Sequence, residues 1–147
     1  MSCSRSSSAR KLIPLRWAFA VALALPGVAS ADEVFKPTSA ITLPAGQNIT
    51  SFDIGFVDPT LGVYVLADRT NKSIDVVETE KNTVAVQLGK FVGFTGNNDT
   101  SGPNGVLIVD HHEVWAGDGN SKVKVIDLLT HKTTHVIDTG GIARADE

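Results

Sequence analysis

Cysteine is almost absent from this chain, since its 147 residues contain one, Cys3, near the N-terminus. The sequence beyond that position therefore offers no disulfide and no thiol nucleophile. Cys3 also precedes the apolar stretch of the N-terminus, which excludes lipid attachment at a cleavage-site cysteine. Any domain further along the chain has to be stable without covalent cross-links.

Long hydrophobic runs are also missing, because the longest, "WAFAVALAL" from Trp17 to Leu25, is too short to span a bilayer comfortably. Basic residues precede it at Arg5, Arg10, Lys11 and Arg16, and Pro26, Gly27 and the small-residue site Ala29-Ser30-Ala31 follow it. This order is typical of a secretory signal peptide. We predict cleavage between Ala31 and Asp32, no retained membrane span, and a periplasmic or secreted protein.

Clusters of basic residues are absent after the predicted cleavage site. Four of the 13 Lys and Arg residues lie before it, so residues 32–147 carry nine basic against 16 acidic side chains, a net charge near −7. Nucleic acids and anionic membranes are recognised by clustered Lys and Arg. The composition therefore predicts that neither is a partner.

Known catalytic motifs are missing as well, and the catalytic residues stay unknown. There is no G-x-S-x-G, and "GDGNSK" lacks the spacing of a phosphate-binding loop. His111 and His112 are adjacent, so their side chains point in different directions, and "NNDTSG" begins like a calcium loop but meets Ile108 where a bidentate acid is required. The sequence indicates no metal site and no cofactor.

The most informative feature that is present is an internal repeat. Two units each contain four short β-rich runs separated by turn-forming residues, and Ala67 and Asn71 recur 49 positions later as Ala116 and Asn120. The runs of the first unit are 52–58, 63–68, 73–78 and 83–88, and those of the second are 105–110, 113–118, 122–128 and 133–139. Each unit is predicted to be a four-stranded antiparallel meander.

Repeats of this length with four strands are typical of β-propeller blades, so the predicted fold class is all-β, a partial propeller. The predicted organisation is a signal peptide (1–31), an N-terminal segment with a lone outer strand (32–51), a first blade (52–88), a long loop (89–104), a second blade (105–140) and the start of a missing blade (141–147).

Two blades leave sheet edges and faces without partners. We therefore expect either a fragment of a longer protein or a short form that assembles from several chains through open blade edges. The faces left uncovered are predicted to carry Val65, Trp115, Val125 and Ile137, and Trp115 and Tyr64 are expected to pack between blades.

The segments "VYVLADRTNKSIDVVETEKNTVAV" and "EVWAGDGNSKVKVIDLLTHKTTHVI" resemble the YVTN-type β-propeller repeat, and "VKVID" is the nearest match. The resemblance runs from about Ala40 to the C-terminus. It implies a propeller fold, while the family includes exported proteins of diverse roles. Two blades are fewer than the seven usual in that family.

The parity of an antiparallel meander indicates where a site would lie, because the turn between the second and third strands and the connection to the next blade emerge at the same end. We call this the loop-rich end. The predicted ligand-binding residues there are Arg69, Asn71, Asp99, Asn104, Asp118, Asn120, Arg144, Asp146 and Glu147.

The sequence favours a non-enzymatic binding or scaffolding module whose loop-rich end presents residues to a protein or a small ligand. The alternative is a propeller enzyme of the gluconolactonase-like or redox-cofactor-dependent type, with a metal or cofactor at the central channel. Fold alone does not choose between them. The loop at 89–104 is further predicted to be the most mobile internal segment, since it is long and rich in Gly and Asn.

Overall fold

The structure is a computed structural model and describes residues 36–146. The predicted signal peptide, its cleavage site and Glu147 lie outside the described residues. Residues 36–146 contain no helix that is long and apolar enough to cross a bilayer.

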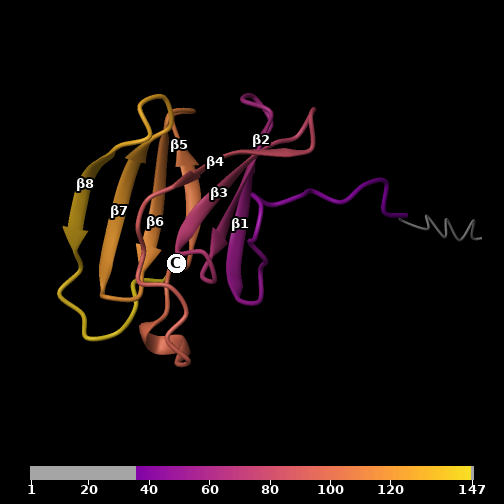
Figure 1. Cartoon of the computed structure of the whole chain (residues 1–147). Helices are drawn as coiled ribbons and strands as arrows, with labels where there is room; N and C mark the ends of the chain where they lie inside the picture. The colour runs from indigo at the N-terminus through magenta and orange to yellow at the C-terminus, as the bar shows by residue number, and fades with distance from the viewer. Residues whose placement is uncertain (1–35, 147) are drawn as a thin grey trace, which may run out of the picture. The chain divides into compact units, whose positions relative to one another are not determined.

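Eight strands form two antiparallel sheets, each with its strands in sequence order (Figure 1). The first sheet, blade 1, contains β1 (Phe52–Asp58), β2 (Val63–Asp68), β3 (Ser73–Glu78) and β4 (Thr83–Leu88). The second, blade 2, contains β5 (Val106–Val109), β6 (Glu113–Asp118), β7 (Lys122–Asp127) and β8 (Thr133–Asp138). The predicted all-β fold with four-stranded meanders is confirmed.

Aspartates close several of the strands because their carboxylates cap the turns that follow. Asp58 Oδ1 accepts hydrogen bonds from the backbone N–H groups of Thr60 and Leu61, at 2.9 and 3.1 Å. Asp127 Oδ1 accepts from the backbone N–H of Thr130 at 2.6 Å. An acceptor at this position satisfies turn N–H groups that have no partner in the sheet.

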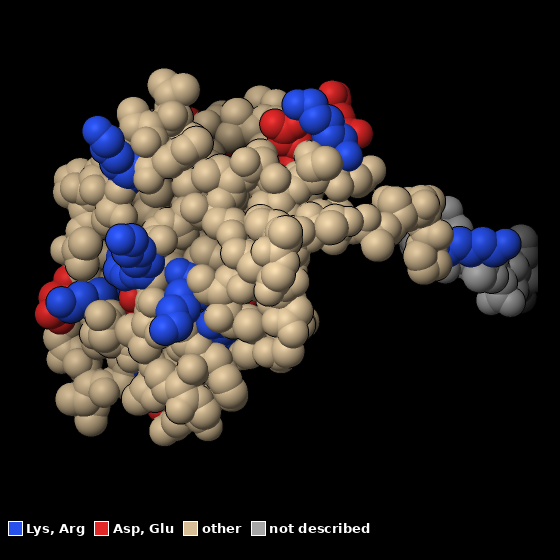
Figure 2. Space-filling model, in the orientation of Figure 1, with Lys and Arg blue, Asp and Glu red and all other residues tan. Residues whose placement is uncertain are grey.

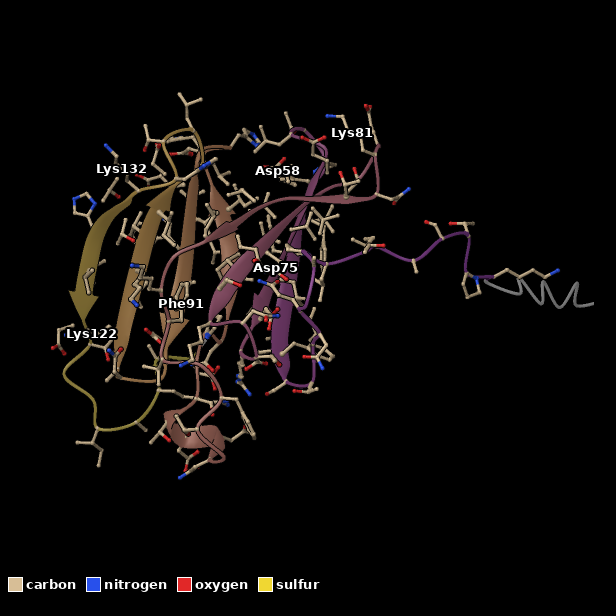
Figure 3. The ribbon with its side chains drawn as sticks, in the orientation of Figure 1. Asp58, Asp75, Lys81, Phe91, Lys122 and Lys132 are labelled. Carbon is tan, nitrogen blue, oxygen red and sulfur yellow. The ribbon has the colours of Figure 1, made fainter. Side chains whose placement is uncertain are left out.

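The core lies between the two sheets and is built from alternate strand residues, as the period of two requires. Its buried members are Val65, Ala67, Ile74, Val76 and Leu88 from blade 1, Val106, Ile108, Val114, Ala116 and Ile126 from blade 2, and Phe91 from the loop that joins them. Figure 3 shows Phe91 beside the strands of blade 2. The sheets therefore pack face to face as neighbouring blades do.

Two of the residues expected on uncovered faces are buried. Val65 is 0% exposed because it lies on the face of β2 that packs against blade 2. Val125 lies on the other face of its sheet and is 1% exposed, with Trp115 and His135 as its register neighbours. Ile137, at 43% exposed, does lie on an open face.

Trp115 and Tyr64 do not belong to the core between the two sheets. Both are half-buried on the opposite faces of their sheets. The Trp115 indole N–H donates to Glu113 Oε2 at 3.0 Å, and Tyr64 packs beneath Gly55. The repeat pattern predicted that these residues lie on a face of their sheets, but it did not indicate which face of each sheet packs against another blade.

The segment from residue 36 to 51 forms no strand in the structure. It runs beside blade 1, where the side chains of Gln47 and Gln87 exchange hydrogen bonds at 2.9 Å and the backbone N–H of Thr50 donates to Thr70 Oγ1 at 2.9 Å. A strand requires a neighbour with which to exchange backbone hydrogen bonds. The lone outer strand expected in this segment has no such neighbour among the described residues.

Candidate functional site

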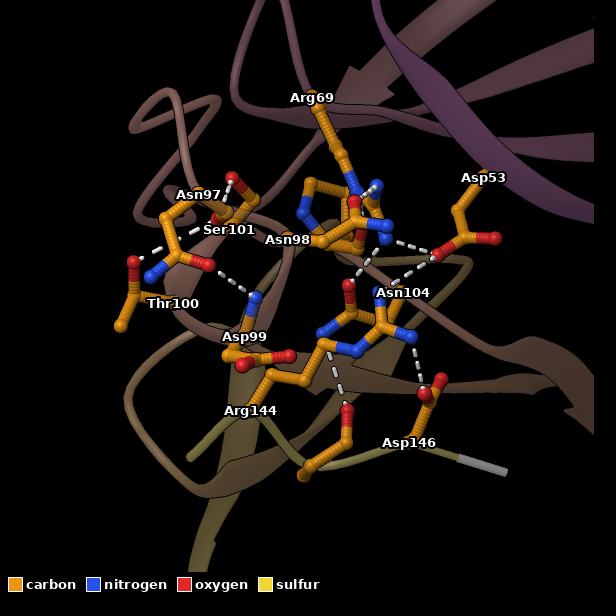
Figure 4. Close-up of polar contacts among 12 residues, drawn as sticks. Asp53, Arg69, Asn97, Asn98, Asp99, Thr100, Ser101, Asn104, Arg144 and Asp146 are labelled. Carbon is orange, nitrogen blue, oxygen red and sulfur yellow. Dashed lines mark hydrogen bonds and ion pairs between the residues drawn. The ribbon is translucent and has the colours of Figure 1, made fainter. Parts of the chain in front are cut away.

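The loop-rich end is organised around Arg69, in the turn between β2 and β3 (Figure 4). The Arg69 side chain is only 6% exposed and donates to four groups. It pairs with the Asp53 carboxylate of β1, and it donates to Asn98 Oδ1 at 2.8 Å, Asn104 Oδ1 at 2.7 Å and the Pro103 carbonyl at 3.2 Å. A buried guanidinium is retained at low cost only when its donors are satisfied, as they are here.

The C-terminal segment is fixed to the same centre through its backbone. Asn104 Nδ2 donates to the Ala145 carbonyl at 3.0 Å, and the Ala145 N–H donates to the Asp118 carbonyl at 2.9 Å. The Arg144 N–H donates to the Asp99 carbonyl at 2.7 Å. The Asn104 amide is 0% exposed and bonds to both Arg69 and the Ala145 carbonyl. It therefore links the long loop to blade 1 and to residue 145.

Of the two arginines in the network, Arg144 is the one that solvent reaches. Its side chain is 23% exposed and pairs through Nη2 with Asp146 Oδ2 at 2.5 Å. Its Nη1 lies 3.6 Å from Asp53 Oδ2, which is an ion pair without a hydrogen bond. Arg144 therefore keeps donor capacity for a ligand, and its Asp146 partner is itself 40% exposed.

The carboxylate of Asp118, at the end of β6, is occupied by contacts within the protein. It is 0% exposed, and its Oδ1 accepts from the backbone N–H groups of Val92 and Gly119, at 3.0 and 2.7 Å. Its Oδ2 makes no hydrogen bond of regular geometry but lies 2.8 Å from Lys124 Nζ, an ion pair. Lys124 Nζ also lies 4.6 Å from the centre of the Phe91 ring, a cation–π contact. Asp118 thus joins blade 2 to the inter-blade loop.

The predicted site residues consequently divide into two groups. Arg69, Asn104, Arg144 and Asp146 meet in one network, whereas Asn71, Asp99, Asp118 and Asn120 contribute no side chain to it. Asn71 is occupied with Asp68, to which it donates from its backbone N–H at 2.9 Å and from Nδ2 at 2.5 Å. The Asp99 carboxylate and Asn120 are exposed. Glu147 lies outside the described residues.

Sequence reasoning missed Asp53 and Asn98. The parity argument contained the signal for Asp53, because β1 begins at the loop-rich end and Asp53 is its second residue. For Asn98 there was no signal. Its role depends on the long loop folding back onto Arg69, and two other asparagines, Asn97 and Asn104, lie in the same loop.

The long loop is more firmly held than its composition suggests. Phe91 is buried near its start, Ser101 and Asn104 near its end, and Gly93 and Gly102 form a two-residue bridge between its arms. A short 3₁₀ helix, η1 (Asn98–Thr100), has Asn97 as its N-cap. Only residues 94–100 are continuously exposed.

Acidic and histidine side chains do not converge on a metal-binding geometry within residues 36–146. At the end opposite the loop-rich one, His111 Nδ1 lies 2.6 Å from Asp58 Oδ2, and this hydrogen bond lowers the pKa of Asp58. The hydrogen bond from His112 Nδ1 to the Asp110 carbonyl raises the pKa of His112. These contacts order a turn and bring no third ligand.

The charged surface is sparse on the face shown in Figure 2. Lys and Arg atoms gather in the left half of that face, a mixed cluster of basic and acidic atoms lies at its upper right, and most of the remaining surface is uncharged.

Comparison with solved structures supports the propeller assignment. Two structures of AztD from Citrobacter koseri, one of them the apo form, match with TM-scores of 0.54 and 0.55 at 16% and 17% identity. The matches cover 73% and 74% of this chain but 29% of each AztD chain. This chain therefore spans less than a third of the length of the structures it matches, and at this identity the likeness shows the fold alone. No protein-family model and no curated protein sequence matches the chain.

Proposed function

We propose that this protein is an exported, non-enzymatic β-propeller module that binds its ligand at the loop-rich end of its blades, with Arg144 as the primary contact. The blades belong, in this proposal, to the YVTN-type repeat. Export is supported by the order of basic residues, apolar stretch and Ala29-Ser30-Ala31 site in the sequence.

The observation that carries the binding proposal is the difference in burial between the two arginines of one network. Arg69 is enclosed and has several acceptors, so it acts as the support. Arg144 is partly exposed and is held in place by its own backbone hydrogen bond to Asp99. A partly solvated guanidinium that pairs with an exposed carboxylate is suited to a ligand carboxylate, which would take the place of Asp146.

A titration with small dicarboxylates tests this site, and calorimetry and thermal unfolding measure the binding. Succinate is the probe, and Arg144→Gln is expected to weaken its binding at least tenfold, since a charge-assisted bidentate pair is lost. Lys81→Gln is the matched control, because Lys81 pairs with Glu78 in the turn between β3 and β4, at the other end of the blade. Equal binding by the wild type and Arg144→Gln would contradict the proposal, as would an absence of saturable binding.

Export is tested separately by mass spectrometry of the protein isolated from its host. The expected mature N-terminus is Asp32. Recovery of intact chain beginning at Met1 from the cytosol would contradict this part of the proposal and leave the binding site to be judged by the titration.

A further inference from the structure

Blade 1 carries two buried carboxyl groups on the face that does not pack against blade 2. Asp68 is 0% exposed and Asp75 is 1% exposed, and both lie beside the β2–β3 turn. The corresponding register positions of blade 2 hold Gly117 and Val125. The repeat therefore does not require acids there, and the pair is a particular feature of blade 1.

The hydrogen bonds of this pair are incomplete. Asp75 Oδ1 accepts from Ser73 Oγ and from Gln87 Nε2, each at 2.9 Å, but Asp75 Oδ2 is buried without a hydrogen-bond partner. Asp68 accepts only from Asn71. No Lys, Arg or His of residues 36–146 forms an ion pair with either carboxylate. A buried carboxylate without a cation is costly. Burial, followed by the charge of the neighbouring Asp68 and by the contact between the two carboxyl groups, raises the pKa of Asp75.

Asp75 also lines a cavity. The cavity has a volume of about 180 Å³ and lies between blade 1 and the extended segment that precedes it. Its other walls are Ile41, Leu43, Ile49, Tyr64, Leu66, Val77 and Val84. Figure 3 shows Asp75 among the strands of blade 1. The cavity thus combines hydrocarbon walls, one aromatic ring and one ionisable group that lacks a counter-ion.

We propose that this cavity binds a small organic ammonium ion, with Asp75 as its counter-ion and the apolar walls around its hydrocarbon part. A hydrophobic pocket with few polar groups is the usual form of a small-molecule site, and the Tyr64 ring can add a cation–π contact. A calcium ion fits less well, because it takes six to eight oxygen ligands. The lining side chains offer oxygen atoms only from Asp75 and Tyr64. The site is independent of the one assigned to Arg144.

Titration of the full chain with n-butylammonium chloride at constant ionic strength tests the proposal. The readout is the set of methyl signals of the cavity residues in ¹H–¹³C NMR spectra. The volume corresponds to about six water molecules, which accommodates four carbons and a nitrogen. We expect saturable shifts of the Ile41, Leu43 and Ile49 methyl groups. n-Butanol, the neutral analogue, is expected to bind at least tenfold more weakly because it cannot form the charged pair.

Asp75→Asn is expected to weaken n-butylammonium binding at least tenfold, whereas Asp99→Asn, which changes an exposed carboxylate, leaves it unaltered. If Asp75→Asn does not fold, Leu43→Trp gives an independent test, since it fills the cavity from the half-buried segment without touching the charge. Leu43→Trp is expected to abolish the shifts. Lack of saturation, equal binding of n-butanol, unchanged binding by these variants, or the same methyl shifts at lower concentrations of CaCl₂ would each overturn the proposal.

Discussion

Single buried carboxylates hold this protein together in different ways, and the Asp118 carboxylate has three partners. This carboxylate is fully buried and joins the backbone N–H groups of Val92 and Gly119 to the ammonium group of Lys124, whose side chain is 14% exposed. Asp68 and Asp75 are equally buried but have no cation. The first arrangement links blade 2 to the inter-blade loop, and the second is the basis for the proposed ligand site.

Replacing Asp118 with Ala should lower the free energy of unfolding by about 1–3 kcal/mol, because Lys124, whose side chain is 14% exposed, loses its ion-pair partner. Two backbone N–H groups also lose their acceptor. Urea unfolding measures the effect. The control is Asp99→Ala, an exposed carboxylate, which should change the free energy of unfolding by less than about 0.5 kcal/mol. Equal effects of the two substitutions would show that the Asp118 contacts contribute little.

The Asp58 carboxylate predicts an acid-dependent loss of stability. Its pKa is lowered, first by the hydrogen bond from His111 and then by those from the following turn. A folded-state pKa below the ordinary value means that the stabilisation is complete above pH 3.8 and is lost as the pH falls through the lowered pKa. Urea unfolding between pH 6 and pH 2 should show this decline, and His111→Gln should reduce it. A decline of the same size in the variant would contradict this assignment.

Among the elements, the turn between β6 and β7 and the long loop depend on close backbone contact. A Cβ atom at Gly119 would lie 2.2 Å from the Thr100 carbonyl oxygen, which cannot be accommodated without moving the loop. Gly119→Ala should therefore lower the free energy of unfolding by about 1–3 kcal/mol and speed hydrogen exchange in residues 98–104. Gly140→Ala is the control, because its φ of +73° carries a backbone cost while nothing lies within 4 Å. Both substitutions can lower the free energy of unfolding, so the rate of hydrogen exchange in residues 98–104 is what distinguishes Gly119→Ala from Gly140→Ala. An equal increase of that rate in both variants would contradict the close contact between Gly119 and Thr100.

Limited proteolysis should cut the long loop before it cuts β7. The exposed residues 94–100 are the expected site, since the flanking residues of the loop are buried or bridged. Peptide mapping after brief digestion gives the position. A first cut within Val123–Asp127 would contradict the blade assignment, and one at 101–104 would contradict the packing of Asn104.

For the whole molecule, residues 32–147 alone are predicted not to behave as a well-folded monomer. Open blade faces leave Phe52, Leu107 and Ile137 at 61%, 45% and 43% exposure, at a cost of roughly 25 cal/mol for each Å² of apolar surface in water. Aggregation, assembly into larger species or non-cooperative melting is expected. Sedimentation and urea unfolding measure this, and a soluble monomer with one sharp transition would contradict it. Trp115 is the sole tryptophan after position 31, so its fluorescence reports association at the blade 2 face.

The strands were predictable from the sequence because their signals are local. Alternating apolar residues, turn residues and strand-ending aspartates specify a meander within about 40 residues, and the repetition of Asn71 at Asn120 marks the second one. The end of the blades at which loops gather also follows from the sequence, since antiparallel order alone fixes it. Arg69 and Arg144 could be placed at one end on that basis.

Tertiary structure decided which of those residues meet and which faces are covered. Whether Asp118 is buried, and whether Arg69 meets Asn98 and Asn104, depends on how the long loop folds back onto the blades. Val65 and Tyr64 are neighbours in β2, yet one lies in the core between blades and the other lines a cavity. A period of two tells residues on opposite faces apart, but only packing decides which face a partner covers. The chemistry of the site depends on that choice.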